Sequence, residues 1–157
     1  SDVCSSDLSY GYKYILKAPL LEHYPDRVIN LHISYLPWNR GYHPNFWSFL
    51  DNTPRGVSIH FIDEGIDTGD LLAQKEVTFG PEEDTLEKTY GRLRVEMENL
   101  FRESWPAIRS QAIAPTKQDE SVGSFHYKRD LEKYWPLLEK GWATPIHQIE
   151  GLRGTHS

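Results

Sequence analysis

NLHISYLPWNRGYHPNFWSFLDNTPRGVSIHFIDEGIDTGD, residues 30–70, is the stretch around which we expect the chain to fold. Residues 27–32, which lead into it, form a short apolar run that predicts a strand buried on both faces. Residues 57–62 alternate between apolar and polar side chains, as a second strand does. Between these strands, Pro37 and Gly41 indicate a loop over residues 33–41. Pro44 then favours a short helix over residues 43–51.

The flanking sequence continues the alternation of strands and helices. Residues 71–77 are predicted as a strand, and residues 18–24 as a short helix. The longest predicted helix starts at a capping pair, Asp84 and Glu87. Its apolar stripe comprises Leu86, Tyr90, Leu93, Met97, Leu100 and Trp105. Residues 130–140 carry a shorter apolar stripe. We therefore predict an α/β domain over residues 9–110 and a short C-terminal subdomain over residues 111–157.

Length and composition narrow the class of protein. A chain of 157 residues suits one domain with a core of ordinary size. Its formal charge of −6 argues against a nucleic-acid-binding surface, which needs clustered Lys and Arg. No apolar run reaches membrane-spanning length. Aromatic residues make up 13% of the chain, and these can wall a pocket for a flat ligand.

The first eight residues, SDVCSSDL, differ from the rest of the chain. They do not begin with Met, show no periodicity, and lack the pattern of a signal peptide. We expect residues 1–8 to be a non-native extension on a chain that starts inside a domain. Cys4 is the single cysteine, so the remaining chain has no disulfide framework, which is compatible with a cytoplasmic protein.

Asn30 and His32 are the first candidate site residues. Residues two apart on a strand project from the same face, so both side chains face one space. Burying them unpaired would cost roughly 1–3 kcal/mol each, which means that they are either a structural hydrogen-bonded pair or functional groups. His43 and His60 have no such neighbour along the chain. We expect a loop residue at His43 and a half-exposed strand residue at His60.

The acidic turn over residues 63–70 is the second candidate. Its carboxylates lack the spacing of a calcium-binding loop, so we predict no metal. Asp63, Glu64 and Asp70 are expected to be solvated turn residues. Asp67 lies between two glycines, and if the turn folds back over the end of the first strand it can orient His32 and favour its charged form. Ligands of α/β sheets bind at such strand ends.

The two candidates together form a specific signature. NLHISYLP followed by GVSIHFIDEGIDTGD resembles the motif of the folate-dependent formyltransferases over about residues 10–105. The resemblance implies a Rossmann-like α/β formyltransferase fold, a mostly parallel sheet flanked by helices. It also implies that this chain lacks the first strands of that fold.

By this resemblance, Asn30, His32 and Asp67 match the catalytic set of the family. The walls that receive the pterin ring of 10-formyltetrahydrofolate, the co-substrate, correspond to two groups of residues. These are Tyr10, Gly11, Tyr12 and Ile15, and then Ile62, Asp63 and Gly65.

The chemistry of the transfer suits these residue types. Attack of an amine on a formyl carbon builds an oxyanion and an ammonium group. Asn30 can donate to the oxyanion, which is typically worth about 2.7–4 kcal/mol. His32 can take the amine proton or stabilise the oxyanion. Asp67 can orient His32 and hold a water for proton transfer. No P-loop or dinucleotide-binding glycine motif is found in the sequence.

Three acceptor amines remain open. Methionyl-tRNA formyltransferases carry a basic C-terminal domain, whereas the tail from Gln111 has six acidic and six basic residues. Glycinamide ribonucleotide formyltransferases have a different loop after the Leu-Pro pair. The WNRGYHPNFWSFLDNTPRGV run and the C-terminal tail resemble sugar N-formyltransferases, which act on nucleotide-linked amino-deoxysugars. The resemblance then makes Lys13, Arg40, Gly41 and Tyr42 substrate-binding candidates, and it is compatible with a homodimer.

Two further interpretations stay open. The chain could be a catalytically silent fragment, because missing strands would expose an apolar sheet edge. It could also be a binding module for a sugar or a folate. The presence of all three polar residues, Asn30, His32 and Asp67, favours an enzyme.

Overall fold

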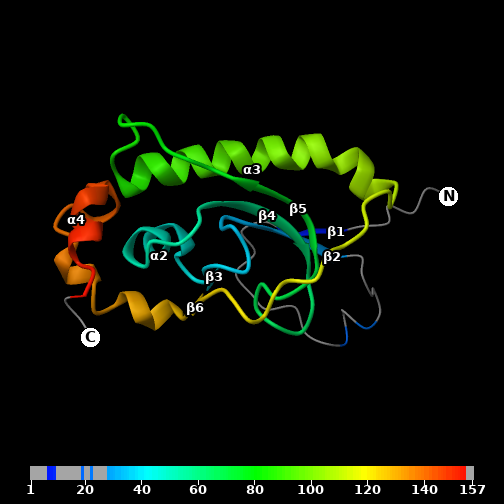
Figure 1. The fold of residues 1–157 in the computed structure, drawn as a ribbon, viewed down its shortest axis with the longest axis horizontal. Coiled ribbons are helices and arrows are strands. Elements are labelled where there is room, and N and C mark those ends of the chain that lie inside the picture. Colours follow the sequence, from blue (N-terminus) through cyan, green and yellow to red (C-terminus); the bar gives the residue numbers. More distant parts are fainter. Residues whose placement is uncertain (1–6, 10–18, 20–21, 23–27, 155–157) are drawn as a thin grey trace.

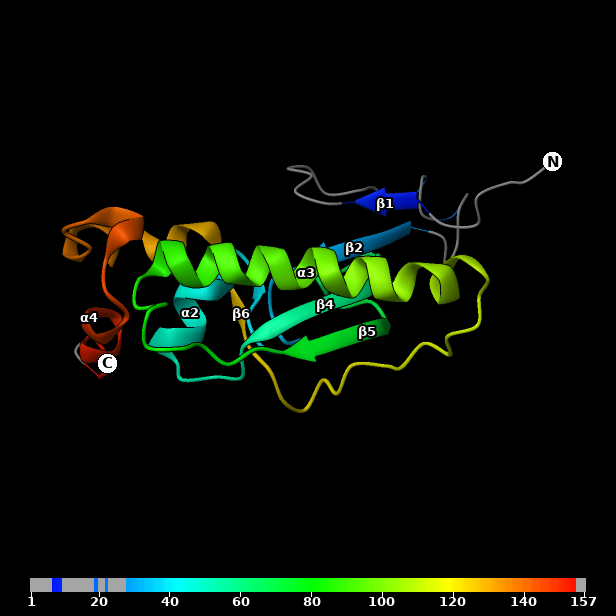
Figure 2. The same ribbon diagram turned by 90° about the horizontal axis from the view of Figure 1, so that it is seen from above.

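The computed structural model describes residues 7–9, 19, 22 and 28–154. Its main sheet has the strand order β1-β2-β4-β5 (Figures 1 and 2). These strands span Asp7–Ser9, Val28–His32, Gly56–Phe61 and Leu71–Glu76. The strands predicted over residues 27–32, 57–62 and 71–77 are therefore confirmed.

The strand directions differ from a mostly parallel sheet. Among the described strands, β1 and β2 are parallel, whereas β2–β4 and β4–β5 are antiparallel. The connection between β4 and β5 is the short acidic turn, and a connection of that length joins antiparallel neighbours rather than parallel ones. The α/β class is confirmed.

Helix α3, Leu86–Arg109, covers one face of the sheet (Figure 2). Its buried Leu93, Met97 and Leu100 pack on Ile29 and Ile59 of the sheet in one apolar cluster. Burial of this kind stabilises the fold by about 25 cal/mol per Å² of apolar surface. This layer leaves the other face of the sheet for the site.

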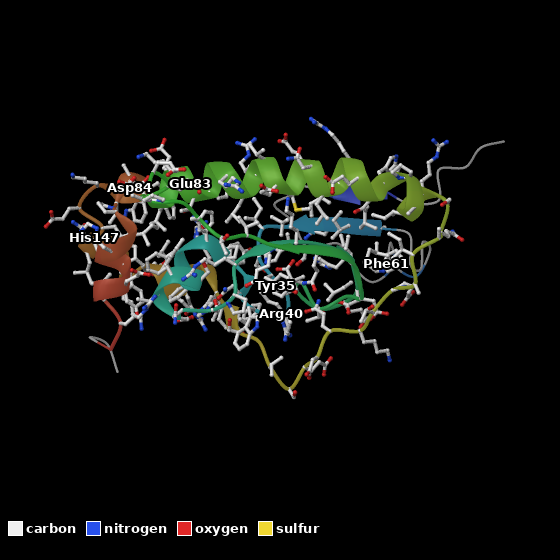
Figure 3. All side chains as sticks on the ribbon, turned by 45° about the horizontal axis from the view of Figure 1, so that its top comes forward. Tyr35, Arg40, Phe61, Glu83, Asp84 and His147 are labelled. Atoms are coloured by element: carbon white, nitrogen blue, oxygen red, sulfur yellow. The ribbon has the colours of Figure 1, made fainter. Side chains whose placement is uncertain are left out.

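Two details of the predicted long helix are wrong. The N-cap is Thr85, whose Oγ1 accepts from the Lys88 amide at 3.2 Å, whereas Asp84 forms an ion pair with Lys88 (Figure 3 labels Asp84 at this end of the helix). Tyr90 is 47% exposed, because Leu86, Thr89 and Leu93 form the buried stripe at this end of the helix.

A second apolar cluster joins α2, Pro44–Leu50, to the C-terminal tail. The tail forms three 3-10 helices, η1 (Lys128–Leu131), η2 (Trp135–Leu137) and η3 (Gly141–Ala143), and then α4, Ile146–Gly151. Of the stripe predicted over residues 130–140, Leu131 and Leu138 are buried in this cluster, but Trp135 is 43% exposed. The helix predicted over residues 43–51 is confirmed.

The loop over residues 33–41 ends in a short strand, β3 (Arg40–Gly41), which pairs in parallel with β6 (Phe125–His126). Figure 1 shows the segment after α3 running back to β6 along the side of the sheet opposite the helix. This segment and the loop therefore enclose the second face of the sheet.

The helix predicted over residues 18–24 lies largely outside the described residues. Asp7 and Leu8 belong to β1, and the expected non-native origin of residues 1–8 stays a prediction. Among the residues that the structure describes, no helix combines the length and the apolar character needed to cross a membrane.

Candidate active site

The site begins with two polar side chains on β2. Asn30 pairs in register with His60 of β4, and His32 pairs with Ser58. Because facing residues of neighbouring strands project on the same side, this face of the β2–β4 pair carries four polar groups. His32 is 8% exposed and His60 is 2% exposed, so their ring nitrogens depend on partners within the protein.

Asp67 supplies the partner from the turn after β4. Asn30 Nδ2 donates to Asp67 Oδ1 at 3.3 Å and lies 3.3 Å from His60 Nε2. The same carboxylate oxygen lies 3.4 Å from His60 Nε2 and 3.5 Å from His32 Nδ1. One amide and two imidazoles therefore converge on a single carboxylate oxygen.

The protonation of His32 follows from its second partner. Its Nε2 lies 3.1 Å from the backbone carbonyl oxygen of Asn39, which can only accept a hydrogen bond. Nε2 therefore carries a proton, and Nδ1 is the nitrogen left facing the carboxylate of Asp67. Asp67 Oδ1, 3.5 Å away, is the acceptor that any proton on Nδ1 would face.

His60 is fixed in the opposite tautomer. Its Nδ1 lies 2.7 Å from the carbonyl oxygen of Phe61, so Nδ1 donates. Its Nε2 lies between the Asn30 amide, which can donate to it in the neutral ring, and Asp67 Oδ1, to which it donates when the ring carries both protons. These contacts set the direction in which the Asn30 amide group points, since its NH₂ group rather than its oxygen must face the carboxylate.

The carboxylate of Asp67 is held in its ionised form. Burial by itself would raise the pKa of Asp67, but the charge of His32 and hydrogen bonds from His60 and the Gly41 amide outweigh it. Together they hold the pKa of Asp67 well below its usual range. The Gly41 amide donates to Asp67 Oδ2 at 2.9 Å. Both carboxylate oxygens thus have partners: Oδ1 faces the side chains of Asn30, His32 and His60, and Oδ2 accepts from the backbone of Gly41.

Residues 8–104 match the family described as formyl transferase. The chain belongs to this family. The Asn-His-Asp motif had indicated it, and the match confirms that prediction.

Among solved structures, the chain resembles the formyltransferase PseJ from Anoxybacillus kamchatkensis. The two are 50% identical with a TM-score of 0.88, and the match covers 92% of this chain and 76% of that one. PseJ was crystallised with UDP-4,6-dideoxy-4-formamido-L-AltNAc and tetrahydrofolate.

Two curated members of the family are also similar. A methionyl-tRNA formyltransferase from Solibacter usitatus is 34% identical over 153 residues, which cover 91% of this chain and 46% of the relative. A dTDP-4-amino-4,6-dideoxyglucose formyltransferase from Mycobacterium bovis is 32% identical over 150 residues, which cover 95% of this chain and 62% of the relative. The chain thus spans about half the length of the curated formyl transferases that it matches.

The three residues predicted as catalytic, Asn30, His32 and Asp67, lie together as expected from the sequence. Asp67 reaches this position with a φ of 55°, a left-handed conformation that Asp adopts more readily than most residues. The turn does fold back over the strand.

The predicted substrate-binding residues lie on the adjacent loop. Gly41 touches the site directly through its amide, whereas Arg40 Nε donates to the Pro37 carbonyl at 3.2 Å. Figure 3 shows Arg40 on the side of the molecule away from α3. Tyr42 is 43% exposed. Lys13 lies outside the described residues.

Of the residues predicted to receive the pterin ring, three are described. The Ile62 amide donates to the Val28 carbonyl at 2.9 Å, and Asp63 Oδ1 accepts from the Gly65 amide at 2.9 Å. The Ile62 amide and the Asp63 carboxylate are therefore already used within the protein. Other backbone groups of this segment would have to make the contacts to a pterin. Tyr10, Gly11, Tyr12 and Ile15 lie outside the described residues.

His60 is the site residue that the sequence analysis missed. We expected a half-exposed residue without a partner, but it is buried and lies within hydrogen-bonding distance of Asn30 and Asp67. The signal was present in the alternation of residues 57–62, where Ser58 and His60 share the polar face. What was not readable was the register that places His60 opposite Asn30.

Proposed function

We propose that this chain carries the catalytic centre of an N-formyltransferase. It transfers the formyl group of 10-formyltetrahydrofolate to the amine of a nucleotide-linked amino-deoxysugar. The observation that carries the proposal is the convergence of Asn30, His32 and His60 on the buried carboxylate of Asp67. Membership of the formyl transferase family supports the reaction class.

The reaction begins with attack of the amine nitrogen on the formyl carbon. A new C–N bond forms, the carbonyl oxygen becomes an oxyanion, and the amine becomes an ammonium group. The Asn30 amide exchanges its contact with His60 Nε2 for a hydrogen bond to the oxyanion, a role typically worth about 2.7–4 kcal/mol.

His32 and Asp67 then move the proton. Nδ1 of His32 accepts the ammonium proton, directly or through one water, and Asp67 stabilises the imidazolium that forms. As the bond from the formyl carbon to the folate nitrogen breaks, the same proton passes to that nitrogen. The carbonyl re-forms, which completes a transfer that needs no metal and no covalent enzyme intermediate.

Similarity to sugar N-formyltransferases supports the choice of acceptor. PseJ, crystallised with a UDP-linked formamido sugar, is 50% identical to the chain, whereas the dTDP-sugar enzyme of Mycobacterium bovis is 32% identical. We therefore place a UDP-linked 4-amino-4,6-dideoxy sugar ahead of dTDP-linked sugars.

A methionyl-tRNA acceptor is the second candidate. The 34% identity to the Solibacter usitatus enzyme favours it. The equal numbers of acidic and basic residues from Gln111 onward weigh against it, since a tRNA surface needs clustered positive charge.

The test is an acceptor panel. The folded protein is incubated with 10-formyltetrahydrofolate and, separately, with UDP-linked and dTDP-linked amino sugars, glycinamide ribonucleotide or methionyl-tRNA. A product heavier by one formyl group with an amino sugar alone is the expected result. Formylation of the tRNA alone would replace the sugar with the second candidate, and no product with any amine would overturn the proposal for this chain.

A further inference from the structure

The segment over residues 116–126 lies beyond the region that matches the family, which ends at residue 104. It nevertheless runs beside the site. Thr116 pairs with Leu71 at the start of β5 through two backbone hydrogen bonds, of 2.7 and 2.9 Å. This pairing brings the following residues against the turn that carries Asp67, on the side of the sheet away from α3 (Figure 1).

Gln118 makes the closest contact with that turn. Its Nε2 donates to the backbone carbonyl of Asp67 at 2.8 Å and to that of Gly69 at 2.8 Å. These are ordinary distances for strong N–H···O hydrogen bonds. The side chain is 9% exposed, so these bonds form away from bulk water. Both amide hydrogens of Gln118 are thus used on two carbonyls of one turn.

The turn is confined from its other side by β4. A Cβ atom placed on Gly69 would lie 1.7 Å from the Phe61 carbonyl oxygen, so the backbone lies directly against the end of the strand. Asp67 itself is in the left-handed region. Residues in such conformations keep them when their surroundings leave no alternative. Gln118 closes the side of the turn that β4 leaves open.

We propose that Gln118 is a positioning residue, which holds the backbone of Asp67 so that its carboxylate reaches His32, His60 and Gly41. The catalytic consequence rests on the proposed function, but the structural consequence does not. Asp67 Oδ1 lies between the two imidazoles and Oδ2 meets the Gly41 amide. Small rotations of the turn would break these contacts together.

The same segment also supports the other half of the site. Ser124 Oγ accepts from the backbone amide of Asn39 at 2.9 Å. The backbone carbonyl of Asn39 is the group that accepts from His32 Nε2. The segment therefore holds the carboxylate through Gln118 and the imidazole through Ser124 and Asn39. A segment outside the matched region thus contacts Asp67 directly and His32 through Asn39.

The test replaces Gln118 and watches Asp67 through Gly41. Gln118→Met keeps the length of the side chain and removes both donors, and Gln118→Glu keeps its shape. Gln148→Met, at an exposed position on α4, is the matched control. Hydrogen exchange of the Gly41 amide, followed by NMR, reports whether the carboxylate is still in place. Exchange at β2 and β4 amides reports on the fold.

We expect Gly41 exchange to rise on the order of tenfold in both Gln118 variants, with β2 and β4 protection unchanged. We also expect kcat to fall about 10–100-fold while KM for both substrates stays within about twofold, as for misplacement of a catalytic group. If Gln118→Met does not fold, the isosteric Gln118→Glu decides by the same readouts.

Gly41 exchange and kcat equal to those of Gln148→Met, in a folded Gln118 variant, would overturn the inference. If the wild-type protein formylates no amine, the proposed function fails while the exchange measurement still decides the role of Gln118. Faster Gly41 exchange with unchanged kcat would overturn the catalytic part of the inference.

Discussion

The two faces of β2 and β4 are both buried, but they are built from different side chains. Toward α3 the strands present Ile29, Leu31, Val57 and Ile59. Toward the loop and the C-terminal segment they present Asn30, His32, Ser58 and His60. Ile59 is 0% exposed and His60, the next residue, is 2% exposed.

The comparison shows that burial alone does not distinguish a core from a site. Apolar groups buried under α3 need only close packing, which adapts to many arrangements. Buried polar groups need specific partners at hydrogen-bonding distance, so each one constrains its neighbours. The polar face is therefore held by specific hydrogen bonds: Asp67 is the common partner of Asn30, His32 and His60, whereas Ser58 bonds Ser34 and Gln74.

Replacing His32 is the strongest way to break the polar face. We expect His32→Ala to lower kcat of the proposed formyl transfer roughly 10²–10⁴-fold, with a modest change in KM, because the proton acceptor is lost. Steady-state kinetics on the acceptor sugar measures both constants. His147→Ala, at an exposed position on α4, should behave as wild type (Figure 3). Wild-type turnover by His32→Ala would contradict the assignment.

The matching change on the apolar face is Ile59→Ala. We expect it to lower the free energy of unfolding by about 2–5 kcal/mol, because it leaves a cavity under α3. The folded fraction should keep its kcat, since Ile59 points away from the site. Urea unfolding followed by fluorescence measures the loss, with Val95→Ala at an exposed position as control. A drop in kcat without loss of stability would mean that the two faces are not separable.

The pH dependence of the free energy of unfolding tests the role of Asp67 in the polar face. Because its pKa in the folded state lies below the ordinary value of 3.8, its carboxylate stabilises the fold above that value. This stabilisation is lost as the pH falls through the depressed pKa, at about 1.4 kcal/mol per unit of depression. Asp67→Asn should therefore be less stable than wild type at neutral pH and lose less stability below about pH 4.

Denaturant titrations from neutral pH to pH 2.5 measure this difference. Glu64→Gln, at an exposed position of the same turn, should follow the wild-type curve. Parallel curves for Asp67→Asn and wild type would show that the ionised carboxylate contributes nothing to the fold.

The smallest predicted effect concerns the start of α3, on the apolar side. Thr85→Ala removes the N-cap and should destabilise the fold by about 1 kcal/mol. Asp84→Ala removes only an exposed ion pair and should change stability by less than about 0.5 kcal/mol. Thermal unfolding distinguishes them, and the reverse order would restore Asp84 as the cap. Neither change should alter kcat.

The sequence predicted local features correctly where one residue or one short run of residues decides them. Pro44 set the start of α2, and the runs over residues 27–32 and 71–77 marked β2 and β5. The start of α3 could not be predicted from the sequence. Asp84 and Thr85 are both residue types that cap helices, and the surrounding backbone selects Thr85. Tyr90 was misplaced because spacing shows which residues share a face, but not how far the covering layer extends.

The candidate site divides in the same way. Asn30, His32 and Asp67 were found because their motif resembles that of a family, and the two strand positions share a face by the period of a strand. Gln118 had no such signal. It lies in a polar segment without periodicity, and its contacts span 49 and 51 residues of sequence.

The sequence alone therefore determined β2, β4 and β5, the long helix, the family and three of the residues that meet at the site. Those follow from local spacing and from a motif whose residues lie close together along the chain. The tertiary structure alone decided that His60 faces Asn30, that Thr85 caps α3 and that Gln118 holds the turn of Asp67. Strand register and long-range hydrogen bonds depend on how distant segments pack, and no local pattern encodes that distance.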